Sequence, residues 1–276
     1  MTGRPKLFVY NYAHNGDIVF SRPLYRRLLD ADCFELLFAG ARNTAYLMED
    51  LVGPHSRLLV CDYADVGNGV TLDPAYALPD DHLPVHTWLG RYPDTHNHQW
   101  VNVVTVFNRQ MEELGLAFRV PYDPTEIPVV DFAARRIGPA VRGKAIYLDN
   151  SFARGRHSDF LFDLAEMAAA FPDHLLLCTA RPEVRAANLV DCSGLDLIEL
   201  SHLSDQCEVI LGKASGPFCC TYTTANRFKP RAVCGYHSIE SPTFWDYPNS
   251  PIRHLDTMEQ VLDFTDQATR CHALTT

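Results

Sequence analysis

The sequence lacks the features that mark membrane and disulfide-bonded proteins. No apolar run approaches the roughly 18 residues that a membrane-spanning helix needs, and MTGRPK leads straight into a strand-like segment instead of a signal peptide. The nine cysteines are odd in number, contain no C-x-x-C pair and mostly lie in apolar runs such as LLVCDY and LLLCTA. We therefore expect buried, reduced thiols in a cytoplasmic protein whose membrane contact is at most peripheral.

The sequence also lacks an excess of basic residues. Its 24 Lys and Arg against 34 Asp and Glu give a formal net charge of −10. This balance argues against a nucleic-acid partner, which would require a basic face, but not against a nucleotide, for which a few local donors are enough. A Walker A loop and a G-x-S-x-G elbow are missing too, so we expect neither a P-loop nor a hydrolase triad.

What the chain does contain is an alternation of short apolar runs and amphipathic segments. Its 276 residues, 47% of them hydrophobic, are enough for two domains with real cores. The alternation is typical of parallel sheets covered by helices. In the first half it predicts strands at 6–13, 34–40, 57–63 and within 85–92, and helices at 23–31, 43–52 and 100–115.

The same rhythm restarts after a proline-rich linker within residues 121–143. It predicts strands at 145–151, 174–180, 195–200, 207–213 and 231–236, and helices at 160–171 and 257–272, the last with Thr257 as its N-cap. We therefore predict an α/β protein with two Rossmann-like domains, at 1–130 and 140–276.

Ligands of open α/β sheets bind beyond the carboxyl ends of the strands, so the loops that follow predicted strands are candidate sites. The first is HNGD, with His14, Asn15, Gly16 and Asp17. Gly16 permits a tight turn. Asp17 is interpreted either as a helix cap, which the helix dipole favours, or as a general base with His14 beside it.

Three loops of the second half carry groups that suit a phosphate. Hydroxyls, amides and cations follow the strands there, and the alternative for each loop is a plain connection with a helix cap. The Ser-Gly-Pro turn additionally opens a helix whose first N–H groups could hold a diphosphate. The candidates are Asn150, Ser151, Arg154 and Arg156; Thr179 and Arg181; and Lys213, Ser215, Gly216 and Pro217.

A histidine-rich stretch of the first half allows three interpretations. His82, His86, His96 and His98 alternate with aromatic residues, Trp88 among them. Their spacing matches no familiar zinc motif. A surface on which a sugar stacks and a locally packed loop both remain open.

Two of these segments resemble glycosyltransferases of the GT-B class, particularly the heptosyltransferase-like family (glycosyltransferase family 9). They are HNGDIVFSRPLYRRL and ILGKASGPFCCTYTTANRFKPRAVCGY. The resemblance implies two Rossmann-like domains facing across a cleft, with the acceptor on domain 1–130 and the nucleotide sugar on domain 140–276. The chain departs from the family at Ala214, where an acidic residue is usual, and at Phe218, where a histidine is frequent.

The resemblance further implies an enzyme of glycan biosynthesis. The enzyme would transfer a sugar from a nucleotide-sugar co-substrate to a saccharide, glycolipid or other hydroxyl acceptor. The transfer would be inverting and metal-independent and would need no other cofactor. Asp17 would be the base, with His14 nearby, and the phosphate candidates above would hold the donor. The acceptor would contact Asn15, Gly16, His86, Trp88, His96 and His98. Because of Ala214, a catalytically inactive nucleotide- or sugar-binding protein is the alternative, and a nucleotide-sugar 2-epimerase is a third reading.

Overall fold

The chain divides into two compact units, Met1–Pro128 and Val129–Thr276. The structure is a computed structural model. It describes residues 3–11, 15–61, 64–65, 70–71, 78–88, 91–92, 94, 99–123, 126–133, 140–152, 158–237, 245 and 252–273.

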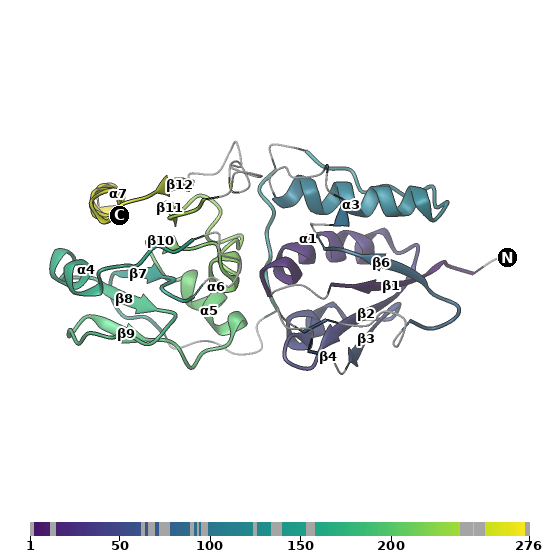
Figure 1. The fold of residues 1–276 in the computed structure, drawn as a ribbon, viewed down its shortest axis with the longest axis horizontal. Helices are drawn as coiled ribbons and strands as arrows, with labels where there is room; N and C mark the ends of the chain where they lie inside the picture. The colour runs from purple at the N-terminus through teal and green to yellow at the C-terminus, as the bar shows by residue number, and fades with distance from the viewer. Residues whose placement is uncertain are drawn as a thin grey trace. The chain divides into compact units, whose positions relative to one another are not determined.

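The first unit is built on a four-stranded parallel sheet of order β3-β2-β1-β6 (Figure 1). Leu7, Phe8 and Val9 of β1 are fully buried, as expected for a strand covered on both faces. A separate antiparallel pair joins β4 to β5. The elements are β1 (Lys6–Tyr10), α1 (Asn15–Ala31), β2 (Glu35–Ala41), the 3₁₀ helix η1 (Ala45–Leu51), β3 (Ser56–Cys61), β4 (Ala64–Asp65), β5 (Val70–Thr71), β6 (Leu83–His86) and α3 (Gln99–Glu113).

Helix α1 begins earlier than the sequence predicted. It starts at Asn15, so Gly16 and Asp17 belong to its first turn, and Pro23 lies inside it. A buried ion pair fixes the helix to η1, because the guanidinium of Arg22 contacts the carboxylate of Asp50 with 2.7 Å between Nη2 and Oδ2. The polar stretch that follows β1 is therefore shorter than expected and leads directly into a helix held by its own buried charge.

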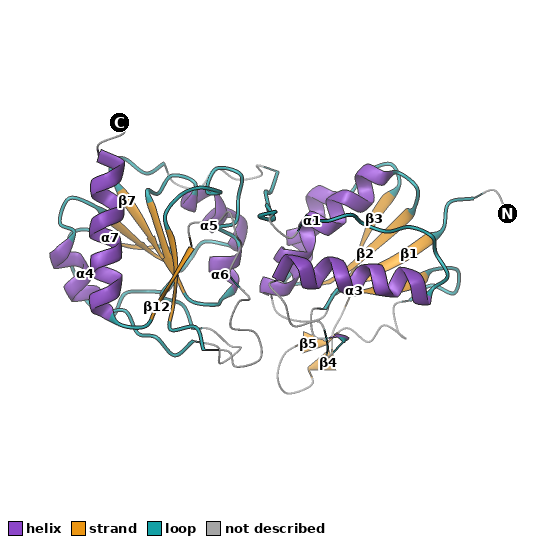
Figure 2. Ribbon diagram, turned by 90° about the horizontal axis from the view of Figure 1, so that it is seen from above, coloured by secondary structure: helices purple, strands orange, loops and turns teal. Residues whose placement is uncertain are grey.

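The second unit is built on a six-stranded parallel sheet of order β12-β11-β10-β7-β8-β9. Helices α4 and α7 lie on one face of this sheet, and α5 and α6 lie on the other (Figure 2). The elements are β7 (Ala145–Leu148), α4 (Leu164–Ala170), β8 (Leu175–Cys178), β9 (Leu189–Asp191), α5 (Leu197–Ser204), β10 (Val209–Gly212), α6 (Gly216–Cys219), β11 (Arg231–Cys234), β12 (Ile252–Leu255) and α7 (Met258–Ala273).

The prediction of a strand at 195–200 is wrong, because this segment begins helix α5. Asp196 caps the helix by accepting hydrogen bonds from the backbone N–H groups of Ile198 and Glu199, and the Glu199 carboxylate accepts the N–H of Asp196. This capping box outweighs the strand-like apolar run. The predicted helix at 43–52 is the shorter 3₁₀ helix η1, and strands β9 and β12 were not predicted.

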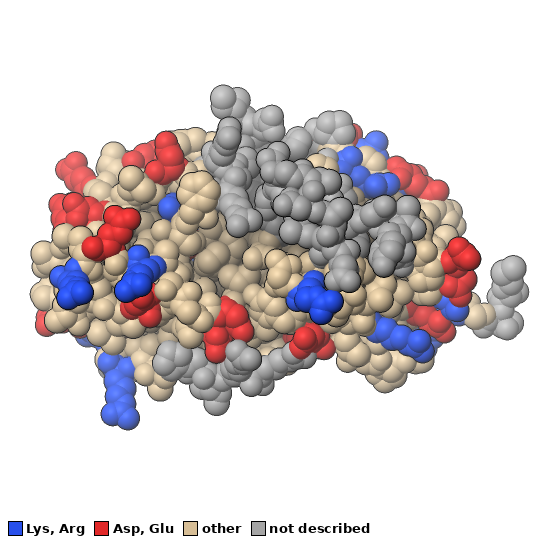
Figure 3. Space-filling view, turned by 60° about the horizontal axis from the view of Figure 1, so that its bottom comes forward, with Lys and Arg blue, Asp and Glu red and all other residues tan. Residues whose placement is uncertain are grey.

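The cysteine and charge patterns follow the sequence analysis closely. In the described part of the chain none of the nine cysteines forms a disulfide; Cys33 and Cys271 are exposed and the other seven are buried. Acidic and basic side chains are interspersed on the face drawn in Figure 3. In the part of the chain that the structure describes, no helix combines the length and the apolar character needed to cross a membrane.

Candidate functional site

The second sheet has a topological switch point between β7 and β10. From β7 the chain continues outward through β8 and β9, whereas β10 begins the opposite half with β11 and β12. Leu148 of β7 is paired with Leu211 of β10, so the residues that follow both strands emerge side by side. Such a point at the carboxyl edge of an open α/β sheet is where ligands bind.

Asp149, the residue after β7, is the centre of this edge. Its side chain is fully buried. One carboxylate oxygen accepts the Thr179 hydroxyl at 2.8 Å and also both the hydroxyl and the N–H of Ser151. The other oxygen accepts the hydroxyl of Ser215. Asp149 therefore ties together the segments that follow β7, β8 and β10, and the sequence analysis had not proposed it as a site residue.

Lys213 lies beside this carboxylate, directly after β10. The residue is only 5% exposed. Among the described residues, no hydrogen bond or ion pair reaches its ammonium group. Burial lowers the pKa of Lys213 from its usual value, and the nearby Asp149 charge partly offsets this effect. A buried ammonium group, which has three N–H donors, is suited to anionic oxygens.

The Ser215 hydroxyl is used in hydrogen bonds within the protein. The Ser215 hydroxyl donates to Asp149 and accepts the N–H of Phe218, which makes Ser215 the N-cap of α6. Helix α6 has only four residues, Gly216–Cys219, with Pro217 in its first turn. The hydrogen of the Ser215 hydroxyl is thus not directed at a ligand, and the helix is too short for a strong dipole.

The other predicted donor residues differ in their surroundings. Asn150 joins two loops, because its amide bonds both the N–H and the carbonyl of Ala180 at 2.8 and 3.1 Å. The Arg181 side chain is 86% exposed and lies 4.0 Å from Asp191. Arg154 and Arg156 lie outside the described residues. The structure therefore brings Ser151, Thr179, Lys213 and Ser215 together around Asp149, and Arg181 points into solvent at the surface.

The first sheet has its own switch point, between β1 and β6. The side chains there form a buried network of neutral groups. The Asn11 amide donates to the Thr87 hydroxyl at 3.3 Å, and the Tyr25 hydroxyl lies 2.8 Å from the same oxygen. Burial raises the pKa of Tyr25 to about 12, so it stays a neutral phenol. This network holds α1 against the ends of both strands.

His86 belongs to the same edge. Its ring stacks on Tyr10, with centroids 4.7 Å apart, and lies 6.1 Å from the ring of Trp88, which is 36% exposed. Gln110 of α3 bonds both the N–H and the carbonyl of His86. Burial, aided by Arg91, lowers the pKa of His86 to about 3, so the imidazole is neutral near pH 7. A neutral, aromatic surface of this kind suits an uncharged ring compound such as a sugar.

Asp17 stands in the first turn of α1, at the same carboxyl edge. It is half-buried, Gly16 is likewise half-buried, and Asn15 is exposed. The backbone carbonyl of Asp17 accepts the Ser21 hydroxyl at 2.8 Å. His14, His96 and His98 lie outside the described residues. A carboxylate in the first turn of a helix interacts favourably with the helix dipole.

Within the described residues, no three His, Cys, Asp or Glu side chains form a group that could hold an ion. His82, one of the four clustered histidines, lies 2.7 Å from Asp81. The chain contains one Asp-x-Asp triplet, Asp30-Ala31-Asp32, but Asp32 is ion-paired with Arg4 at the opposite end of α1 from Asp17.

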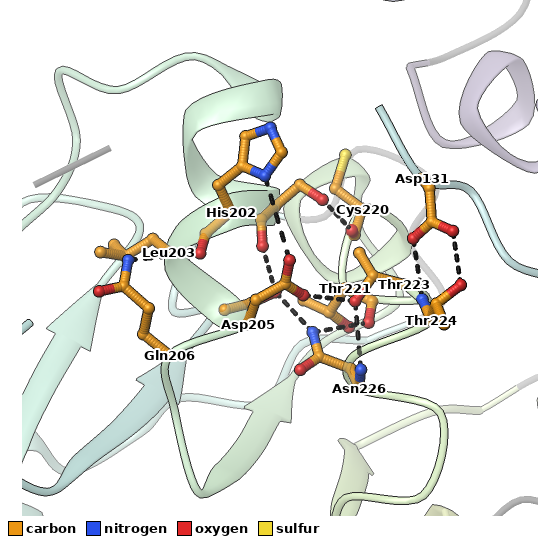
Figure 4. Close-up of polar contacts among 12 residues, drawn as sticks. Asp131, His202, Leu203, Asp205, Gln206, Cys220, Thr221, Thr223, Thr224 and Asn226 are labelled. Carbon is orange, nitrogen blue, oxygen red and sulfur yellow. Dashed lines mark hydrogen bonds and ion pairs between the residues drawn. The ribbon is translucent and has the colours of Figure 1, made fainter. Parts of the chain in front are cut away.

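A second polar cluster of the second unit surrounds the end of α5 (Figure 4). Asp131 accepts both the N–H and the hydroxyl of Thr224, at 2.8 and 2.6 Å. Asp205 accepts the Thr223 hydroxyl, and burial raises the pKa of Asp205. Asn226 donates to the hydroxyl of Ser204 at 2.8 Å. These bonds fix the segment that follows α6, so much of the TYTTAN run has a structural role.

Comparisons with known proteins identify the fold but no sequence relative. No protein-family model matches the sequence, and no curated protein matches it significantly. Among solved structures, heptosyltransferase WaaC of E. coli with ADP has a TM-score of 0.60 at 9% identity, over 95% of this chain and 99% of that one.

Two further structures are similar to the chain at the same level. The family 9 glycosyl transferase of Veillonella parvula DSM 2008 has a TM-score of 0.57 at 11% identity, over 96% of this chain and 89% of that one. The iron-containing dodecameric glycosyltransferase TibC of enterotoxigenic E. coli H10407 has 0.58 at 13%, over 98% and 77%. The predicted fold class is confirmed: the chain has the two-domain α/β fold of the GT-B glycosyltransferases.

Proposed function

We propose that this protein is an inverting glycosyltransferase that moves a sugar from a nucleotide-sugar donor to a hydroxyl of a saccharide, glycolipid or other acceptor. The observation that carries the proposal is the buried Lys213 ammonium, unpartnered by the described residues, at the switch point of a sheet with the GT-B fold. ADP and ADP-2-deoxy-2-fluoro heptose are bound in structures of the similar E. coli heptosyltransferase.

The donor diphosphate would bind at the edge of the second unit. Lys213 would contact its oxygens and stabilise the negative charge that grows on them as the bond to the sugar breaks. Ser151 and Thr179 give their hydrogens to Asp149 and so offer lone pairs to any ligand. This arrangement favours a ligand that carries hydroxyl groups beside its phosphates, as a nucleotide sugar does.

The acceptor would bind at the edge of the first unit. The acceptor oxygen forms a bond to the anomeric carbon, its proton moves to the Asp17 carboxylate, and the nucleoside diphosphate leaves with the electrons of the broken bond. The exposed ring of Trp88 would contact the acceptor sugar, and the buried, neutral His86 would lie behind it. No step of this scheme requires a metal ion.

The decisive variant is Asp17→Asn. The amide cannot accept the proton, so turnover should fall about 10²- to 10⁴-fold while donor binding stays unchanged. The assay incubates UDP-, GDP-, ADP- and CMP-sugars with a saccharide panel and measures nucleotide release, with and without EDTA. Turnover of the Asn variant near that of the wild type would remove Asp17 from the base role.

The binding-protein alternative has its own outcome in the same assay. It is favoured by Ala214, which replaces the acidic residue usual at this turn. A wild-type protein that is stabilised by a nucleotide sugar in a thermal-shift titration, yet never releases nucleotide with any acceptor, would support it over the transferase. Loss of activity in EDTA would contradict the metal-independent scheme.

A further inference from the structure

We infer that Asp149 is a positioning residue that holds Lys213 as a fixed cation for the donor diphosphate, in place of the acid that is missing at position 214. The inference rests on the proposed function. It assigns a role to a residue that does not itself meet the ligand, since Asp149 is fully buried beneath the loops that it joins.

The geometry places Asp149 next to Lys213 through the sheet itself. The N–H of Asp149 donates to the carbonyl of Leu211 at 2.9 Å, two residues before Lys213. Gly212 lies between Leu211 and Lys213 in the sequence, and a Cβ at that position would lie 3.1 Å from the Asp149 Cβ. The end of β10 and Asp149 are therefore packed in direct contact.

The carboxylate is held in place by donors from the strand ends. It accepts hydrogen bonds from Ser151, Thr179 and Ser215, and the first of these donates through both its N–H and its hydroxyl. Three of these four donors bond Oδ1 and one bonds Oδ2, so the strand ends fix the orientation of the carboxylate. Its negative charge acts on the neighbouring Lys213 ammonium.

Asp149 is also the acid that acts on Lys213 within the described residues. The other titratable group facing the ammonium is the Cys234 thiol at the end of β11. Burial strongly raises the pKa of Cys234, and Asp149 and Asp256 raise it further, so the thiol stays neutral. Burial alone would tend to discharge Lys213. The Asp149 charge raises the pKa of Lys213 against this effect and so favours the protonated form of the anion-binding group.

The test measures binding of inorganic pyrophosphate by titration calorimetry from pH about 6 to about 10, in wild type and Asp149→Asn. Wild-type binding should weaken at alkaline pH as Lys213 loses its proton. In the Asn variant the amide can keep most of the hydrogen bonds but carries no charge. Its alkaline loss should therefore move to lower pH by about one unit, which is about a tenfold weaker binding at one fixed pH on that limb.

Matched variants separate charge from structure. Asp131→Asn, which changes a carboxylate bonded to Thr224, should leave the alkaline loss in place. Asp149→Glu, which restores the charge, should return it toward the wild-type position. Lys213→Arg should abolish it, because arginine stays charged throughout this range. This variant identifies Lys213 as the titrating group, and Asp149→Glu still tests the role of Asp149 where Asp149→Asn fails to fold.

Three results would overturn the inference. They are equal weakening of Asp149→Asn at every pH, an alkaline loss that does not move in that variant, or an alkaline loss that persists in Lys213→Arg. If these occur while the wild type still transfers sugar, only the role of Asp149 fails. A wild type that binds neither pyrophosphate nor any nucleotide sugar would remove the proposed function as well.

Discussion

The carboxyl edges of the two sheets share a topology and differ in chemistry. Each edge has a switch point, between β1 and β6 in the first unit and between β7 and β10 in the second. The first is lined by buried neutral groups, Asn11, Thr87 and His86, whereas the second contains the buried pair Asp149 and Lys213. One scaffold has thus produced an edge suited to an uncharged ring compound and an edge suited to an anion, as a sugar transfer between two substrates requires.

The largest expected effect on binding comes from a change that removes the charge of the second edge. Lys213→Ala removes the ammonium group that would contact the diphosphate, so nucleotide binding should weaken about tenfold to a hundredfold, or about 1.5–3 kcal/mol. Titration calorimetry with ADP and UDP measures the change. Lys144→Ala is the matched control, because Lys144 is an exposed lysine before the same sheet, at the start of β7. Equal affinity of both variants would contradict a role of Lys213 in binding.

The next effect concerns the neutral edge and appears in acid. The pKa of His86 is about 3 in the folded protein, against about 6.5 in an unfolded chain. The folded state disfavours the protonated ring. The contribution of His86 to the free energy of unfolding is therefore complete above about pH 6.5 and is lost as the pH falls toward 3. At pH about 5 the first unit should have lost about 2 kcal/mol of its free energy of unfolding from this residue.

Hydrogen exchange in β1 and β6 as a function of pH would measure this loss. His86→Phe retains an aromatic ring beside Tyr10 but cannot be protonated. Exchange in this variant should therefore not show the loss of stability that protonation of His86 causes between pH about 6.5 and about 5. The same measurement in β7 and β10 serves as an internal control, because His86 belongs to the other unit. An identical pH dependence in wild type and variant would show that His86 is not the group responsible.

The sequence was sufficient for most strands but not for every helix. Parallel strands are buried on both faces, so continuous apolar runs such as those in β1, β8 and β10 indicate them directly. The error at α5 arose because a short apolar run is the same in a buried strand and a buried helix. The discriminating signal was available: Asp196 and Glu199 have the spacing of a capping box.

The candidate site could be predicted in part for a similar reason. Lys213 and Ser215 are candidates because they belong to the loop that follows a strand, which is a local property of the sequence. Asp149 was missed because its role depends on β7 lying between β10 and β8, and strand order is not written in any local motif. The available signal was an aspartate that ends a buried strand. The neighbouring Asn150 is a predicted donor-binding residue, but its side-chain amide forms hydrogen bonds with the Ala180 backbone.

The smallest predicted effect tests how closely the charged edge is built. A Cβ at Gly212 would lie 2.4 Å from the Phe218 ring and 3.1 Å from the Asp149 Cβ, so Gly212→Ala must move one of them. Overpacking of this kind should cost about 1–2 kcal/mol of the free energy of unfolding. Gly194→Ala is the control, since nothing lies within 4 Å of its new Cβ, and should change stability by less than about 0.5 kcal/mol. Hydrogen exchange should rise in β7 and β10 and stay constant in β1 and β6; a uniform rise in both units would show that the packing of this edge is not a local property.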